Sequence, residues 1–178
     1  MIEKLTKEEK NIKMRSSSAM YRIMHKILLR KSKIFQDKEH LWLMVLDSAL
    51  NIKSLDVISI GTVNETLGNP MEIYSIAMKK RAVYISLIHN HPSGELLPSK
   101  SDIDLTNQVI QVGKMHSIPL IDKLIIGQNG YFSFKDTGLL LELEMSLKYI
   151  PHYKFWEKIT EILSNEEYLN KSKRFINV

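Results

Sequence analysis

Two histidines, a serine and an aspartate follow one another at spacings that suit a metal site. His89 and His91 are two residues apart, and Ser99 and Asp102 follow within the stretch HNHPSGELLPSKSD. A catalytic zinc ion is held by three protein ligands and keeps a fourth position open for water. His89, His91 and Asp102 could supply these ligands, so the spacing predicts a zinc centre that activates water for hydrolysis.

The neighbouring segments are expected to bring these donors together. AVYISLI at 82–88 is a short apolar, β-branched run typical of a buried strand, and it ends directly at His89. Residues two apart at a strand end project to the same side, so both imidazoles can reach one ion while Asn90 points away. A proline, a serine and a glycine then end the strand, and a helix over 100–115 returns Asp102 to the histidine pair.

Each half of the motif also has an ordinary structural explanation. Ser99-x-x-Asp102 ahead of an apolar run is typical of a helix capping box, and histidines at a surface need no metal. The two patterns on one short segment, directly after a buried strand, favour the metal site. Capping by Ser99 is compatible with a hydroxyl that faces the substrate oxyanion.

A hydrolase of this kind also needs a carboxylate beside the open metal position, to take a proton from water and return it to the leaving amine. Glu39, Glu72 and Glu95 are the candidates. Glu72 suits the first turn of a helix over 70–80, and Glu95 falls in the loop after the histidines. Glu39 precedes an expected strand and is placed only slightly ahead, so spacing leaves the three open.

Helices and strands alternate along the chain, which favours an α/β layered fold with a mixed sheet. Two hairpins are expected, one within 41–63 and one around the Gln128-Asn129-Gly130 turn. The pattern predicts helices over 16–31, 70–80, 100–115 and within 139–170, and strands over 41–47, 57–63, 82–88, 118–127 and 131–134.

Composition excludes several other chemistries. The 178 residues contain no cysteine, so disulfides, thiolate metal sites and a cysteine nucleophile are excluded. No run of about 18 apolar residues occurs, and the charged N-terminus has no apolar signal-peptide region. A cytoplasmic protein without a membrane span is therefore expected.

Positive charge is concentrated at the start of the chain. Residues 1–36 hold ten lysines and arginines against three glutamates, whereas residues 37–150 hold ten against thirteen acidic residues. A solvated, lysine-rich helix accounts for such a segment, and weak contact with DNA phosphates is the alternative.

The stretch from Glu39 to Asp102 resembles the JAMM superfamily of metalloproteases, also known as MPN-plus or JAB, whose motif is a distant glutamate, H-x-H, seven residues and S-x-x-D. Within it, the chain looks like the RadC family of bacterial proteins over residues 37–141. The closer resemblance rests on HNHPSG at 89–94, Pro98-Ser99, Asp102, Leu105-Thr106, LIIG at 124–127, YFSF at 131–134 and Gly138-Leu139-Leu140.

This resemblance implies a fold, a site and a reaction. The fold is a JAB/MPN-type mixed sheet flanked by helices, similar to cytidine deaminase. His89, His91 and Asp102 would bind zinc (Zn2+), Ser99 would support the oxyanion, and Glu39 would be the general acid/base. The expected reaction is cleavage of a peptide or isopeptide bond in an unidentified peptide or protein substrate.

Three parts are expected: a basic helical N-terminal arm at 1–36, a RadC-like JAB/MPN metal-binding domain at 37–141 and a helical C-terminal extension at 142–178. The extension carries an apolar stripe suited to packing, and a homodimer is one use of it.

The chain departs from the RadC pattern at three positions. Asn69, Met71 and Lys123 stand where the family usually has His, Arg and His. None is expected to be a metal ligand, so metal binding should survive while substrate choice or tuning of the ligands changes.

Two other functions compete with the hydrolase. RadC proteins are also labelled DNA repair proteins, so a repair-associated or mobile-element accessory protein that contacts DNA through the basic arm is the alternative. A catalytically inactive binding module is less favoured, because the full ligand set and a candidate base are present.

Overall fold

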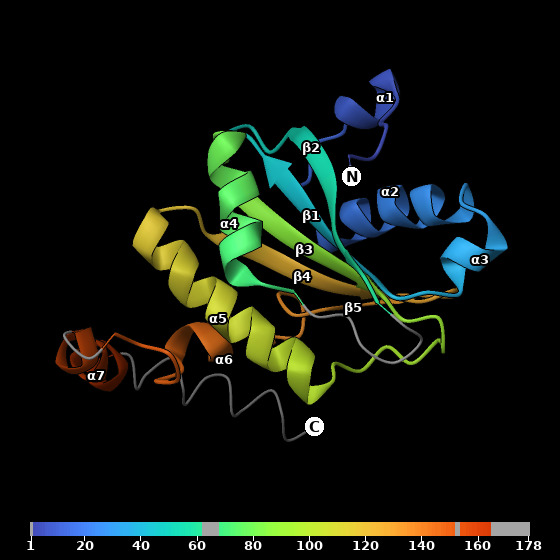
Figure 1. Cartoon of the computed structure of the whole chain (residues 1–178). Coiled ribbons are helices and arrows are strands. Elements are labelled where there is room, and N and C mark those ends of the chain that lie inside the picture. Colours follow the sequence, from blue (N-terminus) through green and yellow to red (C-terminus); the bar gives the residue numbers. More distant parts are fainter. Residues whose placement is uncertain (1, 62–67, 152–153, 165–178) are drawn as a thin grey trace.

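A five-stranded sheet forms the centre of the fold in the computed structural model, which describes residues 2–61, 68–151 and 154–164 (Figure 1). The strands lie in the order β2-β1-β3-β4-β5. Strands β3 and β4 pair in parallel and the other neighbours pair antiparallel, so the predicted mixed α/β fold is confirmed. The strands are β1 (His40–Leu46), β2 (Ile52–Ile60), β3 (Tyr84–Asn90), β4 (Leu120–Ile126) and β5 (Tyr131–Ser133).

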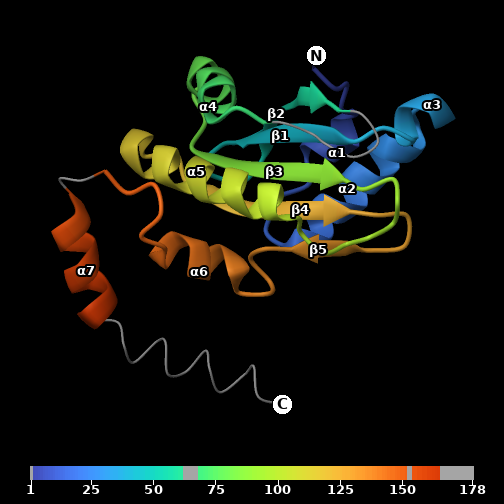
Figure 2. The ribbon, with the colours of Figure 1, turned by 60° about the horizontal axis from the view of Figure 1, so that its bottom comes forward.

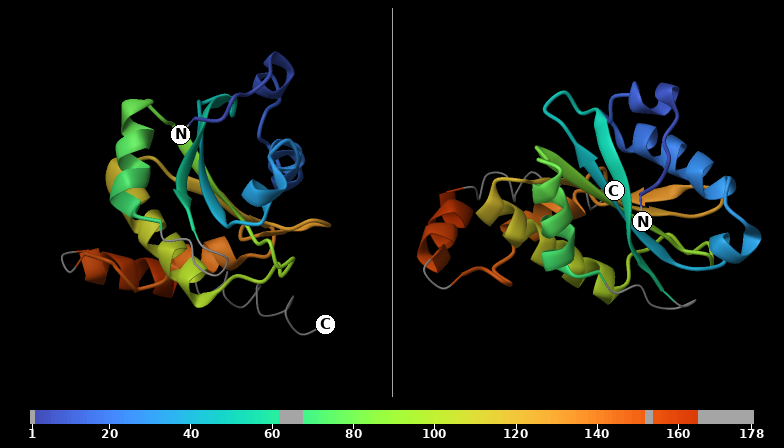
Figure 3. Two further views of the ribbon diagram at one scale, coloured as in Figure 1. Left: turned by 45° about the vertical axis from the view of Figure 1, so that its right-hand side comes forward. Right: turned by 45° about the horizontal axis from the view of Figure 1, so that its top comes forward.

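Helices cover both faces of this sheet. Helices α4, α5 and α6 lie on one face and α2 lies on the other, as Figures 1 and 3 show. Among the described residues, no helix is long and apolar enough to cross a membrane. The helices are α1 (Lys7–Lys10), α2 (Ser17–Leu29), α3 (Lys33–Gln36), α4 (Pro70–Lys79), α5 (Lys100–His116), α6 (Leu139–Met145) and α7 (Phe155–Ser164).

Strand β1 separates two apolar cores because its side chains alternate between the faces of the sheet. Leu41 and Leu43 pack on the side of α4 and α5, whereas Trp42 and Met44 pack on the side of α2. The apolar side chains of α2 therefore form part of the core of the sheet domain.

Short polar side chains cap the starts of α2 and α4. The Ser16 hydroxyl accepts a hydrogen bond from the main chain of Ala19 at the start of α2. The Asn69 side chain accepts from the main-chain N–H of Met71, and Pro70 is the first helical residue of α4. Both helices begin where a short polar side chain can satisfy a free N–H group.

Strand β2 begins earlier than the sequence predicted. The predicted strand was 57–63, whereas the observed strand starts at Ile52, and residues 62 and 63 lie outside the described residues. Ser54 and Asp56 are buried in the first part of this strand, and Lys80, which directly follows α4, donates to both carboxylate oxygens of Asp56, at 2.9 and 3.0 Å. This ion pair between distant residues neutralises the buried Asp56 carboxylate. The polar residues before position 57 resemble a turn when only their neighbours in the sequence are considered.

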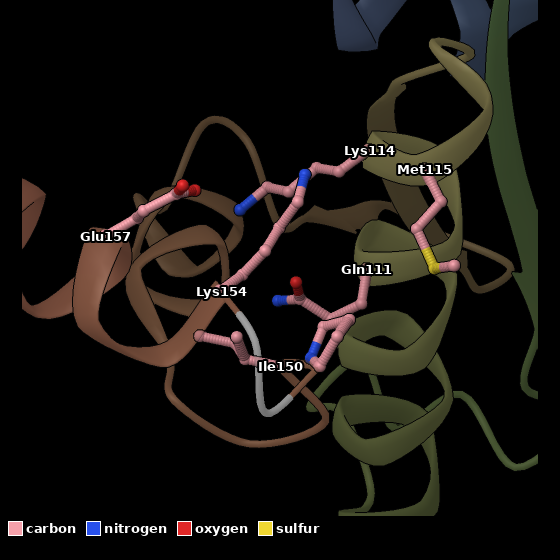
Figure 4. A pocket seen from close by; sticks show the side chains of 7 residues that line it. Gln111, Lys114, Met115, Ile150, Lys154 and Glu157 are labelled. Carbon is pink, nitrogen blue, oxygen red and sulfur yellow. The ribbon is translucent and has the colours of Figure 1, made fainter.

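The region predicted as helical over 139–170 contains two separate helices, α6 and α7, and residues 165–170 lie outside the described residues. The segment after α6 is tied to α5, because the Tyr149 hydroxyl lies 2.7 and 2.9 Å from the two carboxylate oxygens of Asp104. Helix α7 lies beside the C-terminal half of α5, away from the sheet (Figure 2). Between them is a cavity of about 320 Å³ whose lining includes Gln111, Lys114, Met115, Ile150, Lys154 and Glu157 (Figure 4).

Candidate metal centre

Glu39 and His89 meet at one end of the sheet because β1 and β3 run in opposite directions. His89 lies opposite Leu41 in the register of the two strands, and Glu39 directly precedes β1. Alternation along β1 places Glu39 on the same face as Leu41, the face covered by α5. Oε2 of Glu39 lies 3.4 Å from Nε2 of His89.

The two imidazoles of the H-x-H motif lie against each other, as the strand geometry predicted, with ring centroids 4.7 Å apart. Nδ1 of His89 lies 2.9 Å from Oδ1 of Asp102, and Nδ1 of His91 lies 2.7 Å from the main-chain oxygen of Glu95. Both partners accept hydrogen bonds, so we assign the proton of each neutral ring to Nδ1. Each Nε2 then keeps its lone pair, which is the form of imidazole that binds a metal.

The residues present fit a divalent metal ion. Nε2 of His89 is buried and has no hydrogen-bond partner in the described part of the chain, a state that costs about 1–3 kcal/mol. One donor atom each from Glu39, His89 and His91 lie within 4.8 Å of one another. These three residues, here called the triad, form a candidate metal site of nitrogen and oxygen donors.

Asp102 reaches the histidine pair from the first turn of α5. Its Oδ1 lies 2.9 Å from Nδ1 of His89, and its Oδ2 lies 3.7 Å from Nε2 of His91. The predicted return of the helix to the pair is confirmed. The role of Asp102 as a metal ligand stays a prediction, because the described geometry groups Glu39, rather than Asp102, with the two histidines.

Ser99 caps α5 with both arms of the capping box. Its Oγ accepts from the main-chain N–H of Asp102 at 3.1 Å, and Oδ2 of Asp102 accepts from the main-chain N–H of Ser99 at 3.0 Å. The Ser99 hydroxyl also donates to Oδ2 of Asp102 at 2.6 Å. The capping interpretation is confirmed, whereas the oxyanion role stays a prediction.

Lys123 of β4 is a further member of the site that the sequence interpretation missed. Its side chain is fully buried, and its Nζ donates to Oδ1 of Asp102 at 2.8 Å and to the main-chain oxygen of Asp102 at 3.1 Å. The sequence marked Lys123 only as a departure from the family pattern. A lysine inside an apolar strand was the available signal, because a buried ammonium needs a charged partner.

These contacts set the charges of the site. Burial alone would raise the pKa of Asp102, but the hydrogen bond from His89, the nearby His91 ring and the Lys123 ammonium hold that pKa well below its usual range. Burial lowers the pKa of Lys123, and the Asp102 carboxylate opposes this shift. The nearby Asp102 carboxylate raises the pKa of His91. Asp102 is therefore ionised at neutral pH.

Of the three carboxylates considered as the general base, Glu39 is the one that joins the triad. Glu72 is exposed in the first turn of α4. The Glu95 side chain is exposed and accepts from the main-chain N–H of Leu97, so this residue contributes to the site only through its main-chain oxygen.

A mixed sheet flanked by helices, with a candidate metal site formed by two histidines at the end of β3 and by Glu39 just before the neighbouring β1, is consistent with a domain of the JAB/MPN type. Residues 14–139 match the family model described as "RadC-like JAB domain". The chain belongs to this family, and the resemblance drawn from the sequence is confirmed.

Its relatives include several proteins named UPF0758. The one from Desulforamulus reducens is 38% identical over 104 residues, which cover 58% of this chain and 46% of that protein. The one from Protochlamydia amoebophila is 36% identical over 119 residues, which cover 66% and 52%. The one from Methanococcoides burtonii is 39% identical over 103 residues, which cover 58% and 45%. The chain spans about half the length of these curated relatives.

Proposed function

We propose that this protein is a zinc-dependent hydrolase that cleaves a peptide or isopeptide bond. The observation that supports the proposal is the triad of Glu39, His89 and His91, with ionised Asp102 beside both histidines. Two histidines and one carboxylate form a ligand set of catalytic zinc sites. Membership of a JAB-domain family is compatible with this activity.

His89 and His91 would hold the ion through Nε2, and Asp102 would hold it through Oδ2, its oxygen nearer to Nε2 of His91. The bound ion would polarise the scissile carbonyl and lower the pKa of a water molecule to about 7. Glu39 would take a proton from the attacking water and return it to the leaving amine. Ser99 would donate its hydroxyl hydrogen to the oxyanion after rotating away from Asp102.

Metal analysis of purified variants tests this ligand set. The wild type is expected to hold about one zinc ion per chain, which is lost in His91→Ala and weakened in Asp102→Asn but kept in Glu39→Gln. Loss of zinc in Glu39→Gln, with retention in Asp102→Asn, would exchange the roles of the two carboxylates. A wild type that binds no zinc would refute the proposal.

Cleavage itself requires a substrate screen with peptide and isopeptide libraries. Once a substrate is found, Glu39→Gln is expected to lower kcat by about 10²–10⁴-fold, because it removes the group that moves the proton. Glu72→Gln is the matched control, since Glu72 is exposed on α4 and should leave kcat unchanged. Full cleavage by zinc-loaded Glu39→Gln would remove Glu39 from the reaction.

Exposed cations in the N-terminal segment support a second candidate function, contact with nucleic-acid phosphates. Arg15, Arg22 and Lys26 are exposed, and the last two are one turn apart on α2. Binding to DNA that weakens with salt, and that is reduced in Arg22→Gln/Lys26→Gln, would support this function. Absence of binding at low salt would contradict it.

A further inference from the structure

Asn90, the middle residue of the H-x-H motif, points away from the two histidines, as the strand alternation predicted. Its neighbour Ile88 belongs to the core beside α2, so Asn90 lies on that face of the sheet, opposite to His89. The Asn90 side chain is almost fully buried, with 1% of it exposed. A buried amide must be hydrogen-bonded to be tolerated there.

Both groups of the Asn90 amide bind the main chain on either side of Glu39. Oδ1 accepts from the N–H of His40 at 2.8 Å, and Nδ2 donates to the carbonyl oxygen of Lys38 at 2.9 Å. Glu39 is the single residue between these two bonded groups. One side chain of β3 therefore fixes the main chain immediately before and after Glu39.

The amide acts where the main-chain pairing of β1 with β3 stops. The last pair in that register is Leu41 with His89, and His40 and Asn90 are the next residues along each strand. Asn90 thus extends the connection between the strands by one step, through its side chain instead of its main chain. Glu39 lies one residue further, so its placement depends on this extension.

We propose that Asn90 is a positioning residue that holds the Glu39 carboxylate beside His89. This inference rests on the proposed function, in which Glu39 moves the proton. The bonding requires an acceptor at one end of the side chain and a donor at the other, which an asparagine amide provides. An aspartate in its place would keep the acceptor for His40 but would set a carboxylate against the Lys38 carbonyl.

The segment around Glu39 has other attachments, so loss of the amide should displace it without unfolding it. Nδ1 of His40 lies 2.8 Å from the Lys38 oxygen, and the His40 ring stacks on Phe35 and Trp42. A displacement of about 1 Å at a catalytic group can lower a rate by about 100-fold.

The full-length chain loaded with Co2+ provides a test that needs no substrate. The visible spectrum of the bound Co2+ is recorded for the wild type, Glu39→Gln, Asn90→Ala, Asn90→Asp and the double variant Glu39→Gln/Asn90→Ala. We expect all five proteins to bind Co2+, and both single Asn90 variants to show the spectral change of Glu39→Gln. The double variant should match Glu39→Gln alone, because Asn90 acts through Glu39.

Asn107→Ala is the matched control. Asn107 lies on α5 and has a second buried amide, with 3% of the residue exposed. Its Nδ2 donates to Oγ of Ser146 at 3.0 Å. Its replacement removes a similar hydrogen bond away from Glu39 and should leave the Co2+ spectrum unchanged. With a substrate in hand, Asn90→Ala should lower kcat by about 10–100-fold at unchanged KM, with no further loss in the double variant.

The outcomes separate this inference from the proposed function. A spectral change in Glu39→Gln without one in the Asn90 variants overturns the inference alone, as does an equal change in Asn107→Ala. No change in Glu39→Gln removes the Glu39 carboxylate from the surroundings of the ion, which overturns the inference and the role of Glu39 as the base, whereas metal binding by His89, His91 and Asp102 stands. A wild type that takes up no Co2+ refutes the proposed function, and the inference falls with it.

Discussion

Replacement of Lys123 by methionine is expected to lower the free energy of unfolding of the metal-free protein by about 3 kcal/mol. The Lys123 ammonium is fully buried and bonds the carboxylate and the main-chain oxygen of Asp102. Methionine keeps much of the packing but leaves Asp102 without this cation. Removal of one partner of a buried ion pair costs about 3–5 kcal/mol, and Asp102 keeps bonds to His89 and Ser99, which favours the lower end.

A bound metal ion should reduce this cost, because it supplies positive charge beside Asp102. If it restores half of the loss, zinc stabilises the variant by about 1.5 kcal/mol more than it stabilises the wild type. The affinity of the variant for zinc would then be about tenfold higher, since 1.4 kcal/mol corresponds to a factor of ten. Lys123 thus would stabilise the empty site at the expense of metal affinity.

Urea unfolding followed by far-UV circular dichroism, with EDTA or with excess zinc, measures both effects. Lys80→Met is the matched control, because Lys80, which directly follows α4, forms a partly exposed ion pair with Asp56 of β2. That change should cost about 1 kcal/mol or less, equally with and without zinc. A loss below about 1 kcal/mol in metal-free Lys123→Met, or an equal loss in zinc, would refute the reasoning.

Two further predictions concern Ser99 and His91. Ser99→Gly should lower the free energy of unfolding by only a few tenths of a kcal/mol, because glycine is tolerated as an N-cap. The same change should lower kcat at least about tenfold if the Ser99 hydroxyl stabilises the oxyanion. An unchanged kcat would limit Ser99 to capping. Zinc affinity, measured by competition with a chelator between pH 5 and 9, should begin to fall while the pH is still above 6.5, because the raised pKa of His91 lets protons compete there. Protonated His91 stabilises the metal-free fold below pH 6.5, and this contribution is lost as the pH rises through the raised pKa, so His91→Ala should remove this pH dependence of the metal-free stability. A wild-type midpoint at or below pH 6.5 would contradict the assignment.

The sequence predicted those parts of the fold whose boundaries depend on neighbouring residues. Helix α4 begins at Pro70, the start of the helix predicted over 70–80, and α5 begins directly after Ser99, as its capping box indicated. Strand β3 reaches the H-x-H motif because its apolar run and the turn residues after it lie next to each other in the chain. Local propensity and capping are sufficient for such elements.

Features that depend on contacts between residues far apart in the chain could not be predicted from the sequence. Strand β2 contains a buried aspartate, Asp56, whose partner, Lys80, directly follows α4. The burial of Lys123 depends on Asp102 in the same way. Spacing left Glu39 undecided among three carboxylates, because the register of β1 against β3 selects it and no local pattern encodes that register.

The position of β3 between β1 and β4 affects how the metal centre forms during synthesis of the chain. Segments nearer the N-terminus leave the ribosome first, so Glu39 is present before β3 exists to hold it. Asp102 follows, and its buried cation arrives only with β4. Contacts between such distant segments form slowly. All side chains of the candidate site are therefore in place only after β4 has been made and paired with β3, because until then the buried Asp102 carboxylate lacks the Lys123 ammonium.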